Sequence, residues 1–240
     1  MSMTESQATR IILEVDRSEP GKPSRFEVPV PAPTSRVLDA LLYVREHLDP
    51  SLGFRYSCRA GMCGSCAVVV NGREALACQT SIGDLGTSTV RVSPLRALPV
   101  LRDVMCDMAP FFDTLKRAGA AMRPRDPDRK TLRTMPPAEP RRAFIEGQNG
   151  CLTCGACFSA CEWSSTRQGY LGPAAMNRVL MLSLDERDAL GMSRLADVAR
   201  DSGALRCHTL GNCSVVCPVG IPLREGMQKL KGLLATMDVA

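Results

Sequence analysis

Aromatic residues and histidine are scarce in this sequence. Phe, Trp and Tyr make up 4% of the 240 residues, with a single tryptophan, and there are two histidines. Surfaces that bind nucleic acids stack bases on aromatic rings and concentrate positive charge. The 30 basic and 25 acidic residues are mixed along the chain and leave a net charge of only +5. We therefore expect no nucleic-acid partner.

Long hydrophobic runs are missing as well. No stretch of eighteen apolar residues occurs, so we expect no transmembrane helix. The first ten residues, MSMTESQATR, lack the apolar core of a signal peptide. The sequence therefore predicts a cytoplasmic location.

Cysteine, in contrast, is abundant, with 12 residues. The hydrophobic fraction of 45% is large enough to bury a core without disulfide bonds. Because disulfides are disfavoured in a reducing compartment, clustered cysteines there are more often metal ligands. The cysteines are therefore interpreted first as metal ligands.

The first part of the chain has the patterns of a β-rich domain. A helix is predicted over residues 37–47, with Ser35 as its N-cap. Asn71-Gly72 predicts a hairpin turn, because these residue types tolerate the positive φ that such turns need. Strands are predicted at 11–15, 26–30, 67–70 and 89–92. This order of elements fits a ferredoxin-like β-grasp.

The rest of the chain is predicted to be helical. An amphipathic helical stretch covers 100–117, and residues 123–142 are rich in proline and charge, which indicates a boundary or an exposed loop. Helical periodicity recurs at 171–181, 184–190 and 223–234. We therefore expect an α+β chain in three parts: a β-grasp domain (1–98), a connecting helix with a Pro/Arg-rich linker (99–142) and a helical domain (143–240).

Four cysteines of the first domain have the spacing of a plant-type [2Fe–2S] site. The pattern is C-x4-C-x2-C with one more cysteine after eleven residues: Cys58, Cys63, Cys66 and Cys78. Three thiolates must converge from one loop, and Gly61 and Gly64 permit the unusual dihedral angles that this wrapping requires. The alternative is a four-cysteine zinc site, although zinc sites usually pair two short Cys-x-x-Cys turns. The spacing favours the cluster.

Seven cysteines of the second half form two copies of another pattern, one of them complete. The first copy has the C-x2-C-x2-C-x3-C spacing of bacterial ferredoxins: Cys151, Cys154, Cys157 and Cys161. The second copy has three cysteines followed by a proline: Cys207, Cys213 and Cys217. Leu210 stands where the middle cysteine of the second copy is expected. One motif is therefore complete, and the other lacks one ligand.

In two-cluster ferredoxins the last cysteine of each run binds the other cluster. This exchange predicts a [4Fe–4S] site with four thiolates: Cys151, Cys154, Cys157 and Cys217. It predicts a [3Fe–4S] site with three thiolates: Cys161, Cys207 and Cys213. Leu210 cannot bind iron and would fill the vacant corner with hydrocarbon. The alternatives are two zinc sites, or one [4Fe–4S] cluster with spare thiols.

The twelfth cysteine, Cys106, is not part of any motif. It lies in the predicted helix over 100–117, among Val104, Met105 and Met108. A free cysteine commonly packs as a small hydrophobic residue. We expect Cys106 to be part of the core.

At this point the sequence resembles a known family, the iron–sulfur subunits of succinate dehydrogenases and fumarate reductases. The resemblance lies in FRYSCRAGMCGSCAVVVNGREALACQT (54–80), CLTCGACFSAC (151–161), GPAAMNR (172–178) and CHTLGNCSVVCP (207–218). It extends over nearly the whole chain, from about residue 11 to 234. The fold it implies is a β-grasp plant-type [2Fe–2S] ferredoxin domain followed by an all-helical, bacterial-type two-cluster ferredoxin domain.

The resemblance also implies a function. A separate flavoprotein with FAD interconverts succinate and fumarate, and this subunit passes electrons through [2Fe–2S], [4Fe–4S] and [3Fe–4S] to quinone beside a membrane-anchor subunit. The chain itself would then be a non-catalytic electron-transfer subunit of respiratory complex II, peripheral on the inner face of the cell membrane. The alternatives are a quinol:fumarate reductase subunit that runs in reverse, or the partner of another flavoprotein with a non-quinone acceptor.

Several residues depart from the family pattern near the predicted end of this path. His208 matches a family histidine near the quinone and the three-iron cluster; a histidine at a subunit contact is the alternative interpretation. Many succinate dehydrogenases have a quinone-contacting tryptophan where this chain has Thr166, whereas its only tryptophan is Trp163. Glu162 replaces a proline of the same region. The acceptor is therefore less well predicted than the clusters.

Overall fold

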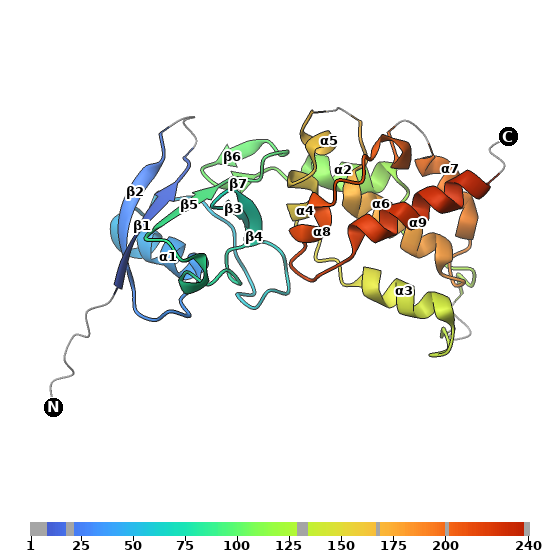
Figure 1. The fold of residues 1–240 in the computed structure, drawn as a ribbon, viewed down its shortest axis with the longest axis horizontal. Helices are drawn as coiled ribbons and strands as arrows, with labels where there is room; N and C mark the ends of the chain where they lie inside the picture. The colour runs from blue at the N-terminus through green and yellow to red at the C-terminus, as the bar shows by residue number, and fades with distance from the viewer. Residues whose placement is uncertain (1–8, 18–21, 129–133, 167–168, 200–201, 238–240) are drawn as a thin grey trace. The chain divides into compact units, whose positions relative to one another are not determined.

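The computed structural model describes residues 9–17, 22–128, 134–166, 169–199 and 202–237 (Figure 1). The chain divides into two compact units, Met1–Asp107 and Met108–Ala240. Each unit is considered by itself below. The predicted division into 1–98, 99–142 and 143–240 stays a prediction.

The first unit is built on a five-stranded sheet in the order β2-β1-β5-β3-β4. Its strands are β1 (Thr9–Val15), β2 (Ser24–Val30), β3 (Ala67–Val70), β4 (Arg73–Leu76) and β5 (Thr89–Ser93). The β1–β5 pair is parallel and the other pairs are antiparallel. Along β1 the side chains of Ile11, Leu13 and Val15 are buried, which is the alternation that a half-buried strand requires. The predicted β-grasp architecture and the α+β class are confirmed.

A helix lies against this sheet. Helix α1 (Val37–Tyr43) continues into a π-helical segment, η1 (Val44–Leu48), so the predicted helix over 37–47 is confirmed in outline. The prediction of Ser35 as its N-cap is wrong. The helix begins after Arg36, whose backbone N–H donates to the carboxylate of Asp39 at 2.8 Å. An acidic residue inside the first turn thus takes the capping role.

The predicted hairpin turn between β3 and β4 is confirmed. Asn71 and Gly72 have φ angles of 47° and 83°, and Val70 pairs with Arg73. The Asn71 side chain also accepts a hydrogen bond from the Arg91 N–H at 2.8 Å. The turn therefore links the hairpin to β5. It also fixes β3 and β4, the two strands that lie between Cys66 and Cys78 in the sequence.

The predicted helix over 100–117 is wrong in its first half. Residues Val100–Arg102 (β6) and Met105–Cys106 (β7) form a small two-stranded sheet, and only Ala109–Arg117 (α2) is helical. The turn between the strands has Asp103 at φ 50°, with its buried carboxylate accepting from Arg17 Nε at 2.8 Å and from the Gly53 N–H at 2.7 Å. This long-range anchor leaves no periodic signal in the local sequence.

Cys106 lies on β7 and not on a helix, but it is buried, as predicted. Its thiol donates to the Leu95 carbonyl at 3.6 Å. Burial raises the pKa of this thiol. Cys106 is therefore a core residue with a satisfied polar atom.

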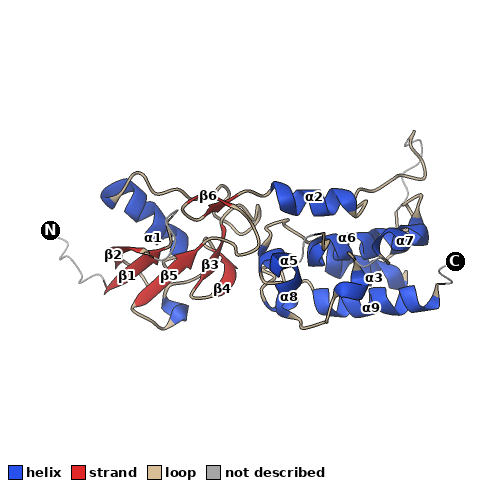
Figure 2. Ribbon diagram, turned by 90° about the horizontal axis from the view of Figure 1, so that it is seen from above, coloured by secondary structure: helices blue, strands red, loops and turns tan. Residues whose placement is uncertain are grey.

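The second unit is a helical assembly around α6 (Gly172–Leu184) (Figure 2). Helices α2, α3 (Pro140–Asn149) and α9 (Leu223–Thr236) pack against α6, nearly all of which is buried. The remaining short helices are α4 (Ala156–Ser159), α5 (Glu162–Thr166), α7 (Leu195–Val198) and α8 (Asn212–Val215), with the 3-10 turns η3 (Gly191–Arg194) and η4 (Ala204–Arg206). A further 3-10 turn, η2 (Gly83–Leu85), belongs to the first unit. The predicted helices over 171–181 and 223–234 are confirmed.

The predicted helix over 184–190 is wrong. Helix α6 ends at Leu184, and the chain turns so that Asp188, which has no exposed surface, pairs with the buried Arg194. Arg194 Nε donates to Asp188 Oδ1 at 2.8 Å, and the same guanidinium donates to the carbonyl of Ala121 at 2.7 Å. A buried ion pair that must also satisfy backbone groups has overridden the local helical periodicity.

Among the described residues, no helix combines the length and the apolar character needed to cross a bilayer.

Candidate metal centres

The first group of cysteines gathers at one end of the β3–β4 hairpin. Three of them lie in the loop before β3, and the fourth lies in the turn after β4: Cys58, Cys63, Cys66 and Cys78. Because Ala67 pairs with Leu76, the hairpin brings the flanking Cys66 and Cys78 together. The Ala77 N–H donates to the Cys66 carbonyl at 3.0 Å and extends this pairing by one step. The hairpin therefore joins the isolated cysteine to the three-cysteine loop.

The loop wraps around the sulfur of Cys58. Three backbone N–H groups donate to Cys58 Sγ at 3.3–3.4 Å, those of Ala60, Met62 and Cys63. Gly61 and Gly64 both have a φ of 72°, the left-handed backbone predicted for them. At Gly61 a Cβ atom would also lie 2.9 Å from the side chain of Gln79. N–H donors directed at a sulfur stabilise its thiolate form, which is the form that binds iron.

Proton affinities differ strongly within this group. Interaction with the Ser65 side chain is the main reason that the pKa of Cys63 is lowered to about 6. Burial, with a further contribution from Cys78, raises the pKa of Cys66 to about 12. Burial therefore opposes deprotonation of Cys66, and a cation bound among the thiols would offset this cost.

The second unit contains two copies of one local structure. Thr153 and Thr209 have φ angles of 51° and 59°, and Gly155 and Gly211 have φ angles of 81° and 93°. Each glycine is followed by a short helix, α4 in the first copy and α8 in the second. The threonine N–H donates to the preceding cysteine in both copies, Thr153 to Cys151 at 3.5 Å and Thr209 to Cys207 at 3.3 Å. The two cysteine motifs thus share a backbone conformation.

Each copy contributes thiols to two separate pockets. A pocket of about 370 Å³ is lined by the first predicted set: Cys151, Cys154, Cys157 and Cys217. Within this set Cys151 and Cys217 act on each other electrostatically, and burial raises the pKa of Cys154 to about 11. The pKa of the fully buried Cys157 is raised well above its usual range by burial and by the neighbouring thiols. The Ile221 N–H donates to Cys217 Sγ at 3.3 Å.

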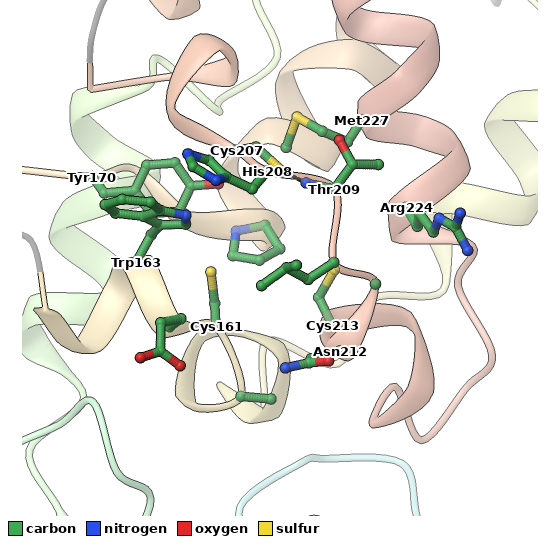
Figure 3. A pocket seen from close by; sticks show the side chains of 15 residues that line it. Cys161, Trp163, Tyr170, Cys207, His208, Thr209, Asn212, Cys213, Arg224 and Met227 are labelled. Atoms are coloured by element: carbon green, nitrogen blue, oxygen red, sulfur yellow. Dashed lines mark hydrogen bonds between the residues drawn. The ribbon is translucent and has the colours of Figure 1, made fainter.

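The second pocket, of about 460 Å³, is lined by the other predicted set, Cys161, Cys207 and Cys213 (Figure 3). Burial, followed by the charges of Cys161 and Cys207, raises the pKa of Cys213 to about 11. Leu210 lines the same pocket and is 67% exposed. It therefore lies at the pocket mouth and does not fill a buried corner.

Two residues beside the second pocket were not predicted from the sequence. Lys231 of α9 donates to the carbonyl of Cys207 and, at 3.3 Å, to the hydroxyl of Thr209. Tyr170 lines the pocket with a buried hydroxyl that has no hydrogen-bond partner in the protein. The only sequence signal for Lys231 is its place on α9, and Tyr170 lies two residues before α6, so neither could be found from cysteine spacing.

The residues near the predicted quinone region also line the second pocket. His208 and Trp163 face each other there with ring centroids 4.7 Å apart and an interplanar angle of 46° (Figure 3). Glu162 lines the pocket too, whereas the Thr166 hydroxyl donates back to the Glu162 carbonyl at 2.7 Å within α5. The pocket rim is thus formed by Trp163 and His208 and not by a side chain at position 166.

The spacing of these thiols bears on the zinc alternative. Zinc needs four ligands about 2.0–2.3 Å from one point. Within the residues that the structure describes, no group of three or more His, Cys, Asp or Glu side chains is close enough to hold one metal ion. The thiols instead line two open pockets. Tyr170, whose buried hydroxyl has no hydrogen-bond partner in the protein, lines the pocket with three thiols. These donor sets fit sulfur-rich groups larger than a single ion.

Comparisons with protein families match both units. Residues 9–113 match the family described as "2Fe-2S iron-sulfur cluster binding domain". Residues 147–221 match the family described as "4Fe-4S dicluster domain". The chain therefore contains a [2Fe–2S] domain followed by a two-cluster domain.

Similar proteins include subunits of two respiratory enzymes. The "Succinate dehydrogenase [ubiquinone] iron-sulfur subunit, mitochondrial" of Dictyostelium discoideum is 37% identical over 206 residues, which cover 83% of this chain and 72% of that protein. The "Fumarate reductase iron-sulfur subunit" of Mycobacterium tuberculosis is 36% identical over 234 residues, 95% of this chain and 94% of that protein. Both relatives are matched along most of their length.

The fold is also found in a solved structure. A chain of the Mycobacterium smegmatis Sdh1 complex in the apo form superposes with a TM-score of 0.84 and covers 97% of this chain and 100% of that chain. The sequence identity is 23%, so this likeness supports the fold alone.

Proposed function

We propose that this chain, which belongs to the family of iron–sulfur subunits of succinate dehydrogenase and fumarate reductase, conducts electrons from a flavoprotein through three clusters to a quinone. One observation carries the proposal. Each of the two pockets in the second unit is lined by thiols from both cysteine motifs, in the combination that exchange of the last cysteines predicts. When bound, iron–sulfur clusters supply one-electron oxidation and reduction.

The proposed ligands of the [2Fe–2S] cluster are Cys58, Cys63, Cys66 and Cys78. Support comes from the hairpin that joins Cys66 to Cys78 and from the three N–H donors on Cys58. These donors hold negative charge on sulfur in a loop that is partly exposed, since Cys58 and Cys63 face the surface. The chain's role here is to ligate and to stabilise charge.

The proposed ligands of the [4Fe–4S] cluster are Cys151, Cys154, Cys157 and Cys217. The proposed ligands of the [3Fe–4S] cluster are Cys161, Cys207 and Cys213. Support comes from the separate pockets and from the thiols that act electrostatically on Cys151, Cys154 and Cys213, which belong in each case to the same set. Cys157 is the exception, because Cys213 of the other set also raises its pKa. This interaction between the sets supports passage of an electron from one cluster to the other.

We also propose the partners. Electrons would enter from an FAD-containing flavoprotein subunit, and a membrane-anchor subunit would hold the complex at the inner face of the membrane. Succinate would bind to the flavoprotein, and this chain would contribute electron transfer and no catalytic residue. The quinone would bind beside His208, because His208 and Trp163 form the aromatic rim of the pocket with three thiols.

The reverse direction, quinol:fumarate reduction, is a second candidate. The near full-length match to a fumarate reductase subunit supports it, as does the absence of a tryptophan at position 166. A flavoprotein partner with a non-quinone acceptor is the third possibility. Both keep the same clusters and differ only in what binds at each end.

Electron paramagnetic resonance of the anaerobically purified complex tests the cluster assignment. We expect an oxidised-state signal of [3Fe–4S] that is lost in Cys161→Ser and retained in Cys106→Ser, the matched control. Cys217→Ser should instead disrupt the [4Fe–4S] cluster. A colourless protein that contains zinc, or loss of the three-iron signal in Cys217→Ser but not in Cys161→Ser, would contradict the proposed ligand sets.

Co-purification tests the partners. A flavoprotein that oxidises succinate with quinone, together with a small membrane subunit, is the expected result. Association with a flavoprotein that does not act on succinate or fumarate would refute the proposed path.

A further inference from the structure

Tyr170 has a polar group that the protein leaves without a partner. Its side chain is only 4% exposed, and its hydroxyl forms no hydrogen bond with the protein. A buried hydroxyl without a partner costs free energy, so such groups usually face a ligand, an ion or an ordered water. The groups that surround the Tyr170 hydroxyl indicate which of these three partners it faces.

The hydroxyl faces the pocket lined by Cys161, Cys207 and Cys213. Tyr170 is one of the lining residues, and Figure 3 shows its hydroxyl directed to the side of the pocket where Cys207 lies. The thiols of Cys161, Cys207 and Cys213 are the groups that act electrostatically on the phenol. The chemistry that surrounds the unpartnered donor is therefore sulfur.

The backbone around Tyr170 keeps the ring in this place. The next residue, Leu171, is buried and donates its N–H to the Ser202 carbonyl at 2.9 Å. Gly172 then begins α6 with a φ of 81°, and a Cβ atom there would lie 2.7 Å from the ring of Phe158. This close approach fixes the start of α6. The phenol therefore has little freedom to turn its hydroxyl toward solvent.

A phenol is protonated near neutral pH and carries one O–H donor. The sulfurs in front of it are the available acceptors. An O–H donor facing anionic sulfur forms a charge-assisted hydrogen bond, which is stronger than one between neutral groups.

The pocket of the other set has no equivalent donor. Its lining includes the apolar side chains of Phe111, Ala174 and Leu223. The one hydroxyl in that lining, on Thr153, donates to the Leu152 carbonyl at 2.7 Å. A buried, unpartnered hydroxyl therefore distinguishes the three-thiol pocket from the four-thiol pocket.

We propose that the Tyr170 hydroxyl donates a hydrogen bond to a sulfur of the group bound by Cys161, Cys207 and Cys213, and thereby raises its reduction potential. The inference rests on the proposed function, because it requires an iron–sulfur cluster in this pocket. Reduction adds negative charge to the sulfurs, so a donor stabilises the reduced form more than the oxidised form. The potential rises as a result.

The substitution Tyr170→Phe tests this in the intact complex. It removes one oxygen and keeps the ring that packs in the pocket wall. In a redox titration followed by paramagnetic resonance, we expect the three-iron signal to persist and its midpoint to fall. A roughly tenfold change in the one-electron equilibrium constant, equal to 59 mV, is expected. The midpoint of the four-iron cluster should stay the same.

Ser165→Ala is the matched control. It also removes a hydroxyl close to the pocket, but that hydroxyl is exposed and donates to the Glu162 carbonyl at 2.9 Å within α5. The midpoint potential of the three-iron cluster in Ser165→Ala should equal that in the unsubstituted protein. An unchanged midpoint in Tyr170→Phe, or an equal fall in both variants, would overturn the inference.

A second measurement needs no substitution. Tyrosine labelled with 17O at the phenol oxygen, incorporated into the unsubstituted protein, should give a hyperfine coupling to the oxidised three-iron cluster. Absence of this coupling would overturn the inference even where Tyr170→Phe fails to retain the cluster. Absence of any three-iron signal in the unsubstituted complex would instead refute the proposed function. The two failures are thus distinguishable.

Discussion

Leu210 occupies in the second cysteine motif the position that Cys154 occupies in the first. Each lies between a threonine and a glycine in left-handed conformation, Thr209 and Gly211 for Leu210, Thr153 and Gly155 for Cys154. The backbone therefore already presents position 210 as it presents a ligand. Only the side chain differs between the two positions.

The substitution Leu210→Cys should add a ligand without altering the backbone. Since Leu210 lines the three-thiol pocket, a thiolate there should complete a four-iron site. We expect the oxidised three-iron signal to decrease and the iron content per chain to rise. Leu210→Ser is the control, because it places a small polar side chain without a thiolate at the same position. If Leu210→Cys retains the full three-iron signal, the vacant corner lies elsewhere.

Lys231 should protect the three-thiol pocket from losing its metal. Its ammonium group joins the Cys207 carbonyl to the Thr209 hydroxyl, and hydrogen bonds with charged groups contribute about 1.5–3 kcal/mol. Lys231→Met should therefore open this loop at least about tenfold more often. The measurement is the rate at which a chelator abolishes the three-iron signal. Lys229 lies on the same helix as Lys231, and its ammonium group lies over the ring of Phe144 on α3. Lys229→Met should leave that rate unchanged.

The buried pair of Asp188 and Arg194 should be important for stability. Asp188→Asn leaves the guanidinium of Arg194 buried without its counter-charge, which costs about 3–5 kcal/mol. We expect a clearly lower denaturant midpoint for the second unit of the cluster-loaded chain. Asp113→Asn breaks an exposed pair with Arg117 and should cost about 0.3–0.5 kcal/mol. Equal losses in the two variants would mean that the burial of the pair is unimportant.

Gly203 should not tolerate a side chain. A Cβ atom there would lie 2.0 Å from the carbonyl oxygen of Val198, so Gly203→Ala must displace the backbone between α7 and η4. We expect a loss of at least about 1–3 kcal/mol, measured by denaturant unfolding. Gly147→Ala, in the middle of α3 with no atom near the added carbon, should stabilise by about 0.5–1 kcal/mol. A neutral Gly203→Ala would contradict the close approach.

The sequence predicted those parts of the molecule that depend on short-range patterns. Alternating buried residues predicted β1. Asn71-Gly72 predicted the turn between β3 and β4, because few residues accept the positive φ that this turn needs. Cysteine spacing also predicted which thiols share a pocket, because exchange of Cys161 and Cys217 follows from the repeat itself.

Features that depend on distant partners could not be predicted. The turn at Asp103 is held by Arg17, and the turn at Asp188 by Arg194 and the backbone near Ala121. In both places the local sequence favours a helix, and an ion pair together with a contact to a residue far along the chain prevents it. Tyr170 shows the same limit for function, since its role depends on which thiols its hydroxyl faces.

The mixed origin of the two pockets has a consequence for how the protein is made. With the proposed ligands, a ribosome that has synthesised the chain only as far as Cys161 has provided three of the four thiolates of one site and one of the three of the other. Neither site can be completed before Cys213 and Cys217 emerge. Iron delivery to the second unit must therefore wait for almost the entire chain, whereas the β-grasp loop can receive its metal much earlier. Truncation before Cys207 should leave a protein with its first cluster alone.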